Sequence, residues 1–295
     1  MRRRRCWWRN SRRSRLVGGQ LGNVAFVIWR ESVEALLVIG ILNAWLSRQQ
    51  VDAARGKLFL WAGVGAGLLI SVVFGLALVL FGESLPDDAQ RGYQTAAVLI
   101  AAALIVQMVF WMRRHGRTLK REIETSLQSA ADRSNWWGVF VLALIAVARE
   151  GSETVVFLYG TLAAARTGTI IAPLAVAAVG LLLAIGTYYL LQLGSRVMSW
   201  KVFFGITEIL LLFLAASLLV TGVDNLIDLG LLPTLSGRLW DSSAILPDHG
   251  PIGGLIGALT GYRARPDLMQ VLVYVAYWSV IYWALFWPRP QAKTA

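Results

Sequence analysis

Long runs of hydrophobic residues, separated by short polar stretches, dominate the chain. A helix needs about 20 apolar residues to cross a bilayer, and several stretches reach that length. The pattern predicts an all-α polytopic membrane protein with seven transmembrane helices. The predicted spans are 21–46, 58–82, 92–112, 136–165, 168–194, 202–223 and 268–288.

The composition supports this class. Hydrophobic residues make up 57% of the 295 positions and charged residues only 15%, whereas a soluble domain usually has about 25% charged residues. Cys6 is the single cysteine, which excludes an internal disulfide framework or a cysteine-based metal cluster. The two histidines, His115 and His249, are too few for a histidine-rich metal site.

The segments between the spans divide the chain further. We expect a cytoplasmic segment over 113–135 and an extracytoplasmic loop over 224–267. That loop ends in an apolar run, 250–262, which is too short to span and is typical of an interfacial or re-entrant piece. The predicted units are a basic tail (1–20), a first three-helix repeat (21–112), the segment 113–135, a second three-helix repeat (136–223), the loop 224–267, a seventh helix (268–288) and a C-terminal tail (289–295).

Loop charges predict an orientation with the first span starting outside and the C-terminus inside. In that arrangement the inner segments hold 13 Lys and Arg residues and the outer loops hold 5, as the positive-inside rule requires. The first fifteen residues add eight Arg residues outside and level this count. We expect the natural protein to start near Leu21, so that these residues come from sequence upstream of the true start codon. The alternative is a genuine tail that reverses the orientation of the protein in the membrane. Nothing folded accompanies this tail, so nucleic-acid binding is not expected.

Two copies of one charged motif stand inside predicted spans. The pattern Arg-Glu-x-x-Glu falls near the middle of the first span and again in the fourth. Each copy opens a group of three spans, and because three is odd the two copies cross the membrane in opposite directions. This arrangement predicts a 3+3 inverted repeat, a common plan in transporters. The six residues are Arg30, Glu31, Glu34, Arg149, Glu150 and Glu153.

Helical spacing predicts what these residues do. Residues three and four apart are neighbours on a helix, so the two glutamates of each copy share a face and each arginine reaches the second glutamate. If the two helices cross, four carboxylates meet near the bilayer midplane. Four Glu and two Arg leave a charge of −2, which is unstable in lipid without a cation. Oxygen ligands select a hard ion, and iron, calcium, magnesium and manganese all remain open.

Other interpretations stay open for the individual residues. The Arg–Glu pairs could be structural links between spans, although ionisable residues within a membrane are functional by default. A further carboxylate, Glu208, lies in the sixth span. It is a candidate additional ligand or proton acceptor, and pairing through a simple hydrogen bond is the alternative.

The paired motif resembles that of the oxidase-dependent iron transporters, which include fungal high-affinity iron permeases and bacterial ferrous-iron uptake permeases. Three further stretches look similar: 111–124, 203–219 and 239–266. The resemblance implies iron uptake across the cell membrane. The implied metal ligands are Glu31, Glu34, Glu150 and Glu153, supported by Arg30 and Arg149.

The resemblance also implies an iron ion as transported substrate rather than a permanently bound cofactor, and an extracytoplasmic oxidase or iron-binding protein as partner. The chain departs from the family pattern within both motifs, where Gly-Leu is usual. The first copy has Ser32 and Val33, and the second has Gly151 and Ser152. The basic tail is also foreign to the family.

Two other functions compete with an iron permease. A proton- or cation-coupled carrier could use the arginines to bind an organic anion and the glutamates to relay protons. A membrane-embedded hydrolase would need a nucleophile and base or a metal-activated water. The chain has no H-E-x-x-H motif, neither histidine lies within a predicted span, and we do not expect an enzyme.

Overall fold

The fold is known from a computed structural model. It describes residues 2–48, 53–115, 136–165, 171–193 and 200–286, except for 234, 236, 238 and 248–250. In these ranges the chain forms eight α-helices and no strand. They are α1 (Arg2–Arg48), α2 (Ala53–Glu83), α3 (Asp87–His115), α5 (Trp137–Ala165), α6 (Ile171–Leu193), α7 (Trp200–Asp228), α8 (Pro251–Thr260) and α9 (Leu268–Phe286).

Four of these helices are long and apolar enough to cross a membrane by length and composition, so the protein is an all-helical membrane protein. A fifth apolar stretch, Ala175–Leu190 within α6, is shorter. The four candidate spans are Ala54–Glu83, Asp88–Arg113, Gly205–Asp228 and Leu268–Leu285.

The helices α1 and α5 are absent from that set for a physical reason. Each carries one copy of the charged motif, which places three ionisable residues inside an apolar stretch of the helix. The eighth helix is α8, which has 10 residues. It is the apolar run for which the sequence predicts an interfacial or re-entrant piece, and it is too short to span.

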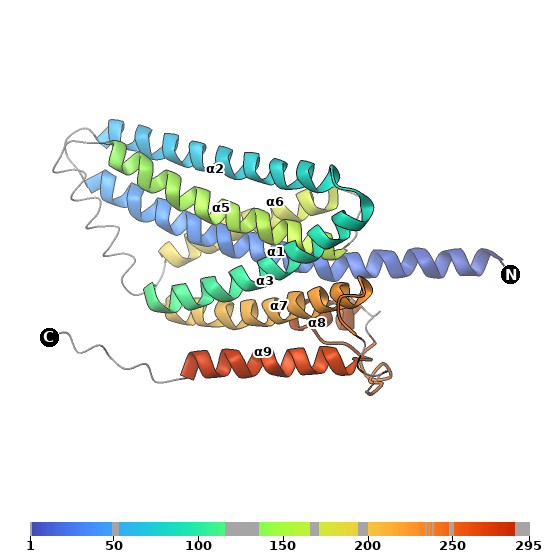
Figure 1. Ribbon diagram of the computed structural model, residues 1–295. Coiled ribbons are helices and arrows are strands. Elements are labelled where there is room, and N and C mark those ends of the chain that lie inside the picture. The colour runs from blue at the N-terminus through green and yellow to red at the C-terminus, as the bar shows by residue number, and fades with distance from the viewer. Residues whose placement is uncertain are drawn as a thin grey trace.

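The first helix extends without interruption from Arg2 to Arg48 and so includes the basic segment 2–20. The predicted boundary at residue 20 therefore does not coincide with the start of a helix. Figure 1 shows the first part of α1 projecting beyond the other helices. At about 1.5 Å per residue, α1 is far longer than the hydrocarbon core of a bilayer.

The helices form a bundle in which segments distant in sequence lie side by side (Figure 1). The most extensive contacts join α2 to α5, α1 to α6 and α3 to α7, and α5 also packs against α1 and α3. The short helix α8 packs against α1 and α7. The helices that carry the two motifs, α1 and α5, are thus direct neighbours.

Small residues on α2 bring it close to α5. A Cβ atom at Gly63 would lie 2.5 Å from the carbonyl oxygen of Phe140, and one at Gly67 would lie 2.9 Å from Cβ of Val147. Such glycines allow helix backbones to approach where lipid supplies no hydrophobic driving force. The contact holds α5, and with it the second motif, at a fixed height along the bundle.

Three buried clusters surround the motif region, the smallest of which pairs Val33 of the first motif with Ala184 of α6. The largest joins α1, α3, α5, α7 and α9 and includes Val27, Ile105, Phe157 and Leu214. The second joins α1, α2 and α5 around Leu46 and Leu60. The outer sides of α2 and α9 expose large apolar side chains instead, as expected for surfaces that contact lipid.

Candidate metal centre

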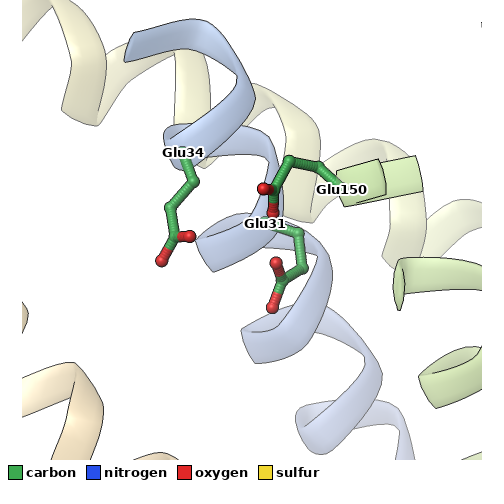
Figure 2. A group of neighbouring side chains, drawn as sticks. All are labelled: Glu31, Glu34 and Glu150. Carbon is green, nitrogen blue, oxygen red and sulfur yellow. The ribbon is translucent and has the colours of Figure 1, made fainter. Parts of the chain in front are cut away.

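Three carboxylates of the two motifs meet in the interior. Glu31 and Glu34 come from α1 and Glu150 comes from α5, and one oxygen of each lies within 4.8 Å of the others. Figure 2 shows the three side chains grouped where the two helices face each other. Glu31 and Glu34 are buried and Glu150 is half-buried. Oxygen atoms at such separations can bind a single cation together.

Arg30 is fully buried beside two of these carboxylates, with a side chain 1% exposed. Its Nη1 lies 2.8 Å from Oε1 of Glu31, and its Nη2 forms an ion pair with Glu34. The second pair is the i,i+4 contact that the spacing predicts. The same Nη1 lies 2.8 Å from Sδ of Met108 on α3. Arg30 therefore neutralises part of the first motif and links α1 to α3.

The second motif is more open. Nε of Arg149 donates a hydrogen bond of 3.1 Å to Oε1 of Glu153, again the predicted i,i+4 pair. The Arg149 side chain is 36% exposed and that of Glu153 is 17% exposed. The guanidinium of Arg149 lies over the ring of Trp111, 3.9 Å from its centroid, at a distance typical of a cation–π contact. Glu153 does not belong to the group of three carboxylates within 4.8 Å.

Several carboxylate oxygens of this region are buried without a hydrogen-bond partner among the described residues. They are Oε2 of Glu31, Glu150 and Glu153, together with Oε1 of Glu34, which forms the ion pair with Arg30. A buried acceptor without a donor is costly, and in hydrocarbon the penalty is larger. These oxygens are therefore suited to a ligand that brings positive charge.

The charge balance supports the same conclusion. Arg30 supplies one positive charge to the three carboxylates that converge, which leaves two negative charges when all are ionised. Like charges a few ångströms apart repel strongly in a medium of low polarity. A divalent cation would neutralise the group, and carboxylate oxygens favour hard ions.

Gly151 inside the second motif has a packing role. A Cβ atom at this position would overlap Oγ of Ser71 on α2. The hydroxyl of Ser71 is itself fixed by a 2.9 Å hydrogen bond to the carbonyl of Gly67. A side chain at position 151 would thus push α5 away from α2. The first motif has Ser32 at the matching place, half-buried, so the two copies differ where their neighbours differ.

Glu208 lies apart from the clustered carboxylates and has a partner of its own. Nε of Arg113, on α3, donates a hydrogen bond of 2.9 Å to Oε2 of Glu208 on α7. Glu208 is buried, whereas the Arg113 side chain is 45% exposed. The pair joins α3 to α7 near the end of α3.

One acidic residue of the loop after α7, Asp241, also has a partner. Asp241 forms an ion pair of 2.8 Å with Arg265. Hydrogen bonds from Ser243 and then from Arg265 hold the pKa of Asp241 well below its usual range. His249 and most of the predicted segment 113–135 lie outside the described residues.

The sequence contains no signal for the contributions of α3 to the site. Met108 and Trp111 contact the two motif arginines, one each. They lie three residues apart in a helix whose sequence pattern is that of an ordinary apolar span. Met and Trp are common in such spans, so only the packing of α3 against α5 and α7 distinguishes them.

The fold and this site define the class: a helical membrane protein with a buried group of carboxylates between two of its helices. Comparison with known proteins specifies it further, because the sequence profile described as "Iron permease FTR1 family" matches residues 22–287. The chain belongs to this iron permease family, which is a family of transporters. The match begins just after the basic segment.

Curated relatives agree with this assignment. The chain is 32% identical to a protein named ferrous iron permease EfeU from Escherichia coli O6:H1 over 259 residues, covering 85% of this chain and 90% of the relative. The protein of the same name from Shigella sonnei is also 32% identical with the same coverage. The one from Yersinia pestis is 29% identical, covering 85% and 88% of the two chains. No solved structure matches the chain significantly.

Proposed function

We propose that the protein carries ferrous iron across the cell membrane through a carboxylate site built from its two Arg-Glu-x-x-Glu motifs. Membership of the iron permease family and the names of the curated relatives support iron as the substrate. The observation that carries the proposal is the convergence of Glu31, Glu34 and Glu150, from two helices, to within 4.8 Å. Iron is the transported ion here and not a resident cofactor.

The fourth motif carboxylate has a separate role in this proposal. Glu153 is bound by Arg149, which is partly exposed and lies over Trp111. When an ion enters, the carboxylate can leave the arginine and become the fourth ligand, because one of its oxygens is buried without a partner among the described residues. Carboxylates bind iron reversibly, whereas thiolates would hold it more tightly.

The helix contacts support a seven-span topology with an inverted repeat. In such a repeat α1, α2 and α3 correspond to α5, α6 and α7. The contact of α2 with α5 then corresponds to the contact of α6 with α1, and both are extensive. The contacts of α1 with α5 and of α3 with α7 each join corresponding helices. Both relations are expected for a two-fold axis in the membrane plane.

We further propose that the N-terminal end of the bundle faces outside and the C-terminus inside, as the loop charges predict. One three-helix half would rock against the other and expose the carboxylates to each side in turn. Glu208, paired with Arg113, is a candidate proton acceptor or later ligand on the inner side. An extracytoplasmic oxidase or iron-binding protein would deliver the ion.

The proposal is tested by uptake of radioactive Fe²⁺ under reducing conditions into liposomes that contain the purified protein. Glu31→Gln and Glu150→Gln keep the side-chain size and remove the charge, so we expect uptake to fall to the level of empty liposomes. Glu83→Gln is the matched control, because this carboxylate is exposed at the end of α2. Uptake that persists in both motif variants would refute the carboxylate site.

A panel of competing solutes separates the proposal from an organic-anion carrier. Mn²⁺ and other hard divalent ions should compete with Fe²⁺ for the same oxygen ligands. Organic anions should not compete, because the arginines are engaged by carboxylates of the protein. Iron-independent uptake of an organic anion would contradict the proposed function.

A further inference from the structure

The loop between α7 and α8 exposes large apolar side chains although it lies outside the helices. Trp240 is 50% exposed and Ile245 is 89% exposed, and their neighbour Leu239 is exposed as well. None of these residues belongs to a helix. Exposed apolar side chains that gather in one place mark a surface that contacts either a membrane or another protein. The position of the loop decides between these two.

The loop is fixed beside the start of α9. The backbone N–H of Leu239 donates a hydrogen bond of 3.0 Å to the carbonyl of Pro266, and that of Ser242 donates one of 2.9 Å to the carbonyl of Ala264. The stretch that contains Trp240 is therefore held along the residues that immediately precede α9. Figure 1 shows the loop next to the N-terminal end of α9, which lies at the edge of the bundle.

The length of α9 gives the depth of this stretch. The helix has 19 residues, which at about 1.5 Å per residue is close to the thickness of the hydrocarbon core, about 30 Å. It has no residues to spare, so its first residue, Leu268, lies at the boundary of the hydrocarbon. Few residues of α9 are buried, and Leu272, one turn further on, is 49% exposed and contacts lipid. Leu239 and Trp240 therefore lie at the level of the lipid headgroups.

A turn directs Ile245 away from the protein. The backbone N–H groups of Ile245 and Leu246 both donate to the carbonyl of Ser242, at 3.0 and 3.1 Å. The hydroxyl of Tyr262 donates to the carbonyl of Leu246 at 3.2 Å. Cγ of Leu246 lies 3.4 Å from the position that a Cβ atom of Gly253 in α8 would take. Leu246 thus packs against α8, and its neighbour Ile245 is left on the outer side.

The charged groups of the loop suit the same location. Oδ2 of Asp241 lies 2.8 Å from Nε of Arg265, and both side chains are about half exposed. The hydroxyl of Ser243 donates to Oδ1 of Asp241 and accepts a hydrogen bond of 3.2 Å from Nη2 of Arg265. The two charges cancel and are hydrogen-bonded within the loop. A neutralised ion pair beside exposed tryptophan and aliphatic side chains is compatible with the headgroup region, where tryptophan concentrates.

We propose that segment 239–246 is an interfacial anchor, which inserts Trp240 and Ile245 into the boundary between headgroups and hydrocarbon. Its partner is the lipid surface of the leaflet at the start of α9, because its apolar side chains continue the lipid-facing surface of that helix. The same segment packs against α8, which contacts α1 and α7, so the anchor attaches this end of the bundle to the bilayer surface. The inference holds for either orientation of the chain and does not rest on the proposed function.

The competing explanation is that the same side chains form a docking surface for another protein. A nitroxide probe separates the two explanations in the full chain, in vesicles of phosphatidylcholine and phosphatidylglycerol. Cys6→Ser removes the single cysteine, and Ile245→Cys then carries the probe. Power-saturation measurements compare its collisions with oxygen, which concentrates in hydrocarbon, and with a nickel chelate, which stays in water. Leu272→Cys is the control for lipid, and Glu83→Cys, exposed at the end of α2, is the control for water.

If the segment is an anchor, the ratio of oxygen to nickel collisions at position 245 exceeds that of Glu83→Cys several-fold and approaches that of Leu272→Cys. A probe at Trp240→Cys gives the same result. A ratio equal to that of Glu83→Cys would overturn the proposal, because the loop would then face water. Low collision rates with both reagents would also overturn it, since another protein chain would cover the loop. If Trp240→Cys does not fold, Ile245→Cys alone decides.

Discussion

The two copies of the Arg-Glu-x-x-Glu motif are alike in sequence and unlike in surroundings. In α1 the arginine is 1% exposed and contacts both glutamates of its own motif. In α5 the arginine is 36% exposed and contacts only the second glutamate. The ion pairs of the first copy are buried, whereas the ion pair of the second copy, Arg149 with Glu153, is partly exposed.

This difference indicates that the two helices have different roles in the proposed transporter. Arg30 cannot move without leaving Glu31 and Glu34 buried without a counter-charge, so the first motif is a fixed part of the site. Arg149 rests on the face of Trp111 and can release Glu153 at a smaller penalty, because exposed pairs are weak. The ion would then be bound against a rigid α1 by a movable part of α5.

The largest expected effect comes from removing the two arginines one at a time. Arg30→Gln should destabilise the protein by about 3–5 kcal/mol, because it leaves buried carboxylates unpaired. Arg149→Gln should cost about 1 kcal/mol or less, since its partner pair is partly exposed. In thermal unfolding of the detergent-solubilised protein, the first change should lower the melting temperature by roughly 10 °C and the second by only a few degrees.

A double variant sharpens this expectation. Adding Glu34→Gln to Arg30→Gln removes one of the unpaired charges. The melting temperature of this double variant should therefore be higher than that of Arg30→Gln alone. The same addition of Glu153→Gln to Arg149→Gln should change little. Equal destabilisation by the two single arginine variants would contradict the difference between the motifs.

The next effect concerns the residue in the middle of each motif. Gly151→Ser makes the second copy like the first, and its Cβ would overlap Oγ of Ser71. We expect a cost of about 1–3 kcal/mol, as for other overpacked sites. The reverse change, Ser32→Gly, should cost only about 0.5–1 kcal/mol from glycine in a helix. Thermal unfolding measures both effects. If adding Ser71→Gly to Gly151→Ser restores the melting temperature, the clash between the two side chains is the cause.

The smallest effect concerns the ring under the exposed arginine. Trp111→Leu removes a cation–π contact worth about 0.5–1 kcal/mol, so we expect Fe²⁺ uptake to slow by roughly threefold with little change in the melting temperature. Trp111→Phe should slow it less, because phenylalanine keeps a weaker aromatic face. Trp137→Leu, at an exposed position at the start of α5, is the control. An unchanged rate in Trp111→Leu would mean that the ring does not position Arg149.

Much of the fold follows from local sequence. Apolar runs predict helices that span a membrane, and the prediction of an all-helical membrane protein is confirmed. The short run in the loop after α7 forms its own helix, α8, so the described part contains eight helices where the spans alone predict seven. The sequence also predicts the Arg30–Glu34 and Arg149–Glu153 pairs, because i,i+4 spacing is a property of one helix.

The sequence by itself determined the class of protein, the helices, the two motifs and the arginine partners within each, since all of these depend on periodicity and spacing along one segment. Only the tertiary structure decided which carboxylates converge, that Arg113 pairs with Glu208, that Met108 and Trp111 reach the arginines, and that Nδ2 of Asn23 donates to the carbonyl of Ala258 in α8. These contacts join residues far apart in the chain. They depend on how small residues let the helices approach, and local sequence does not encode that distance.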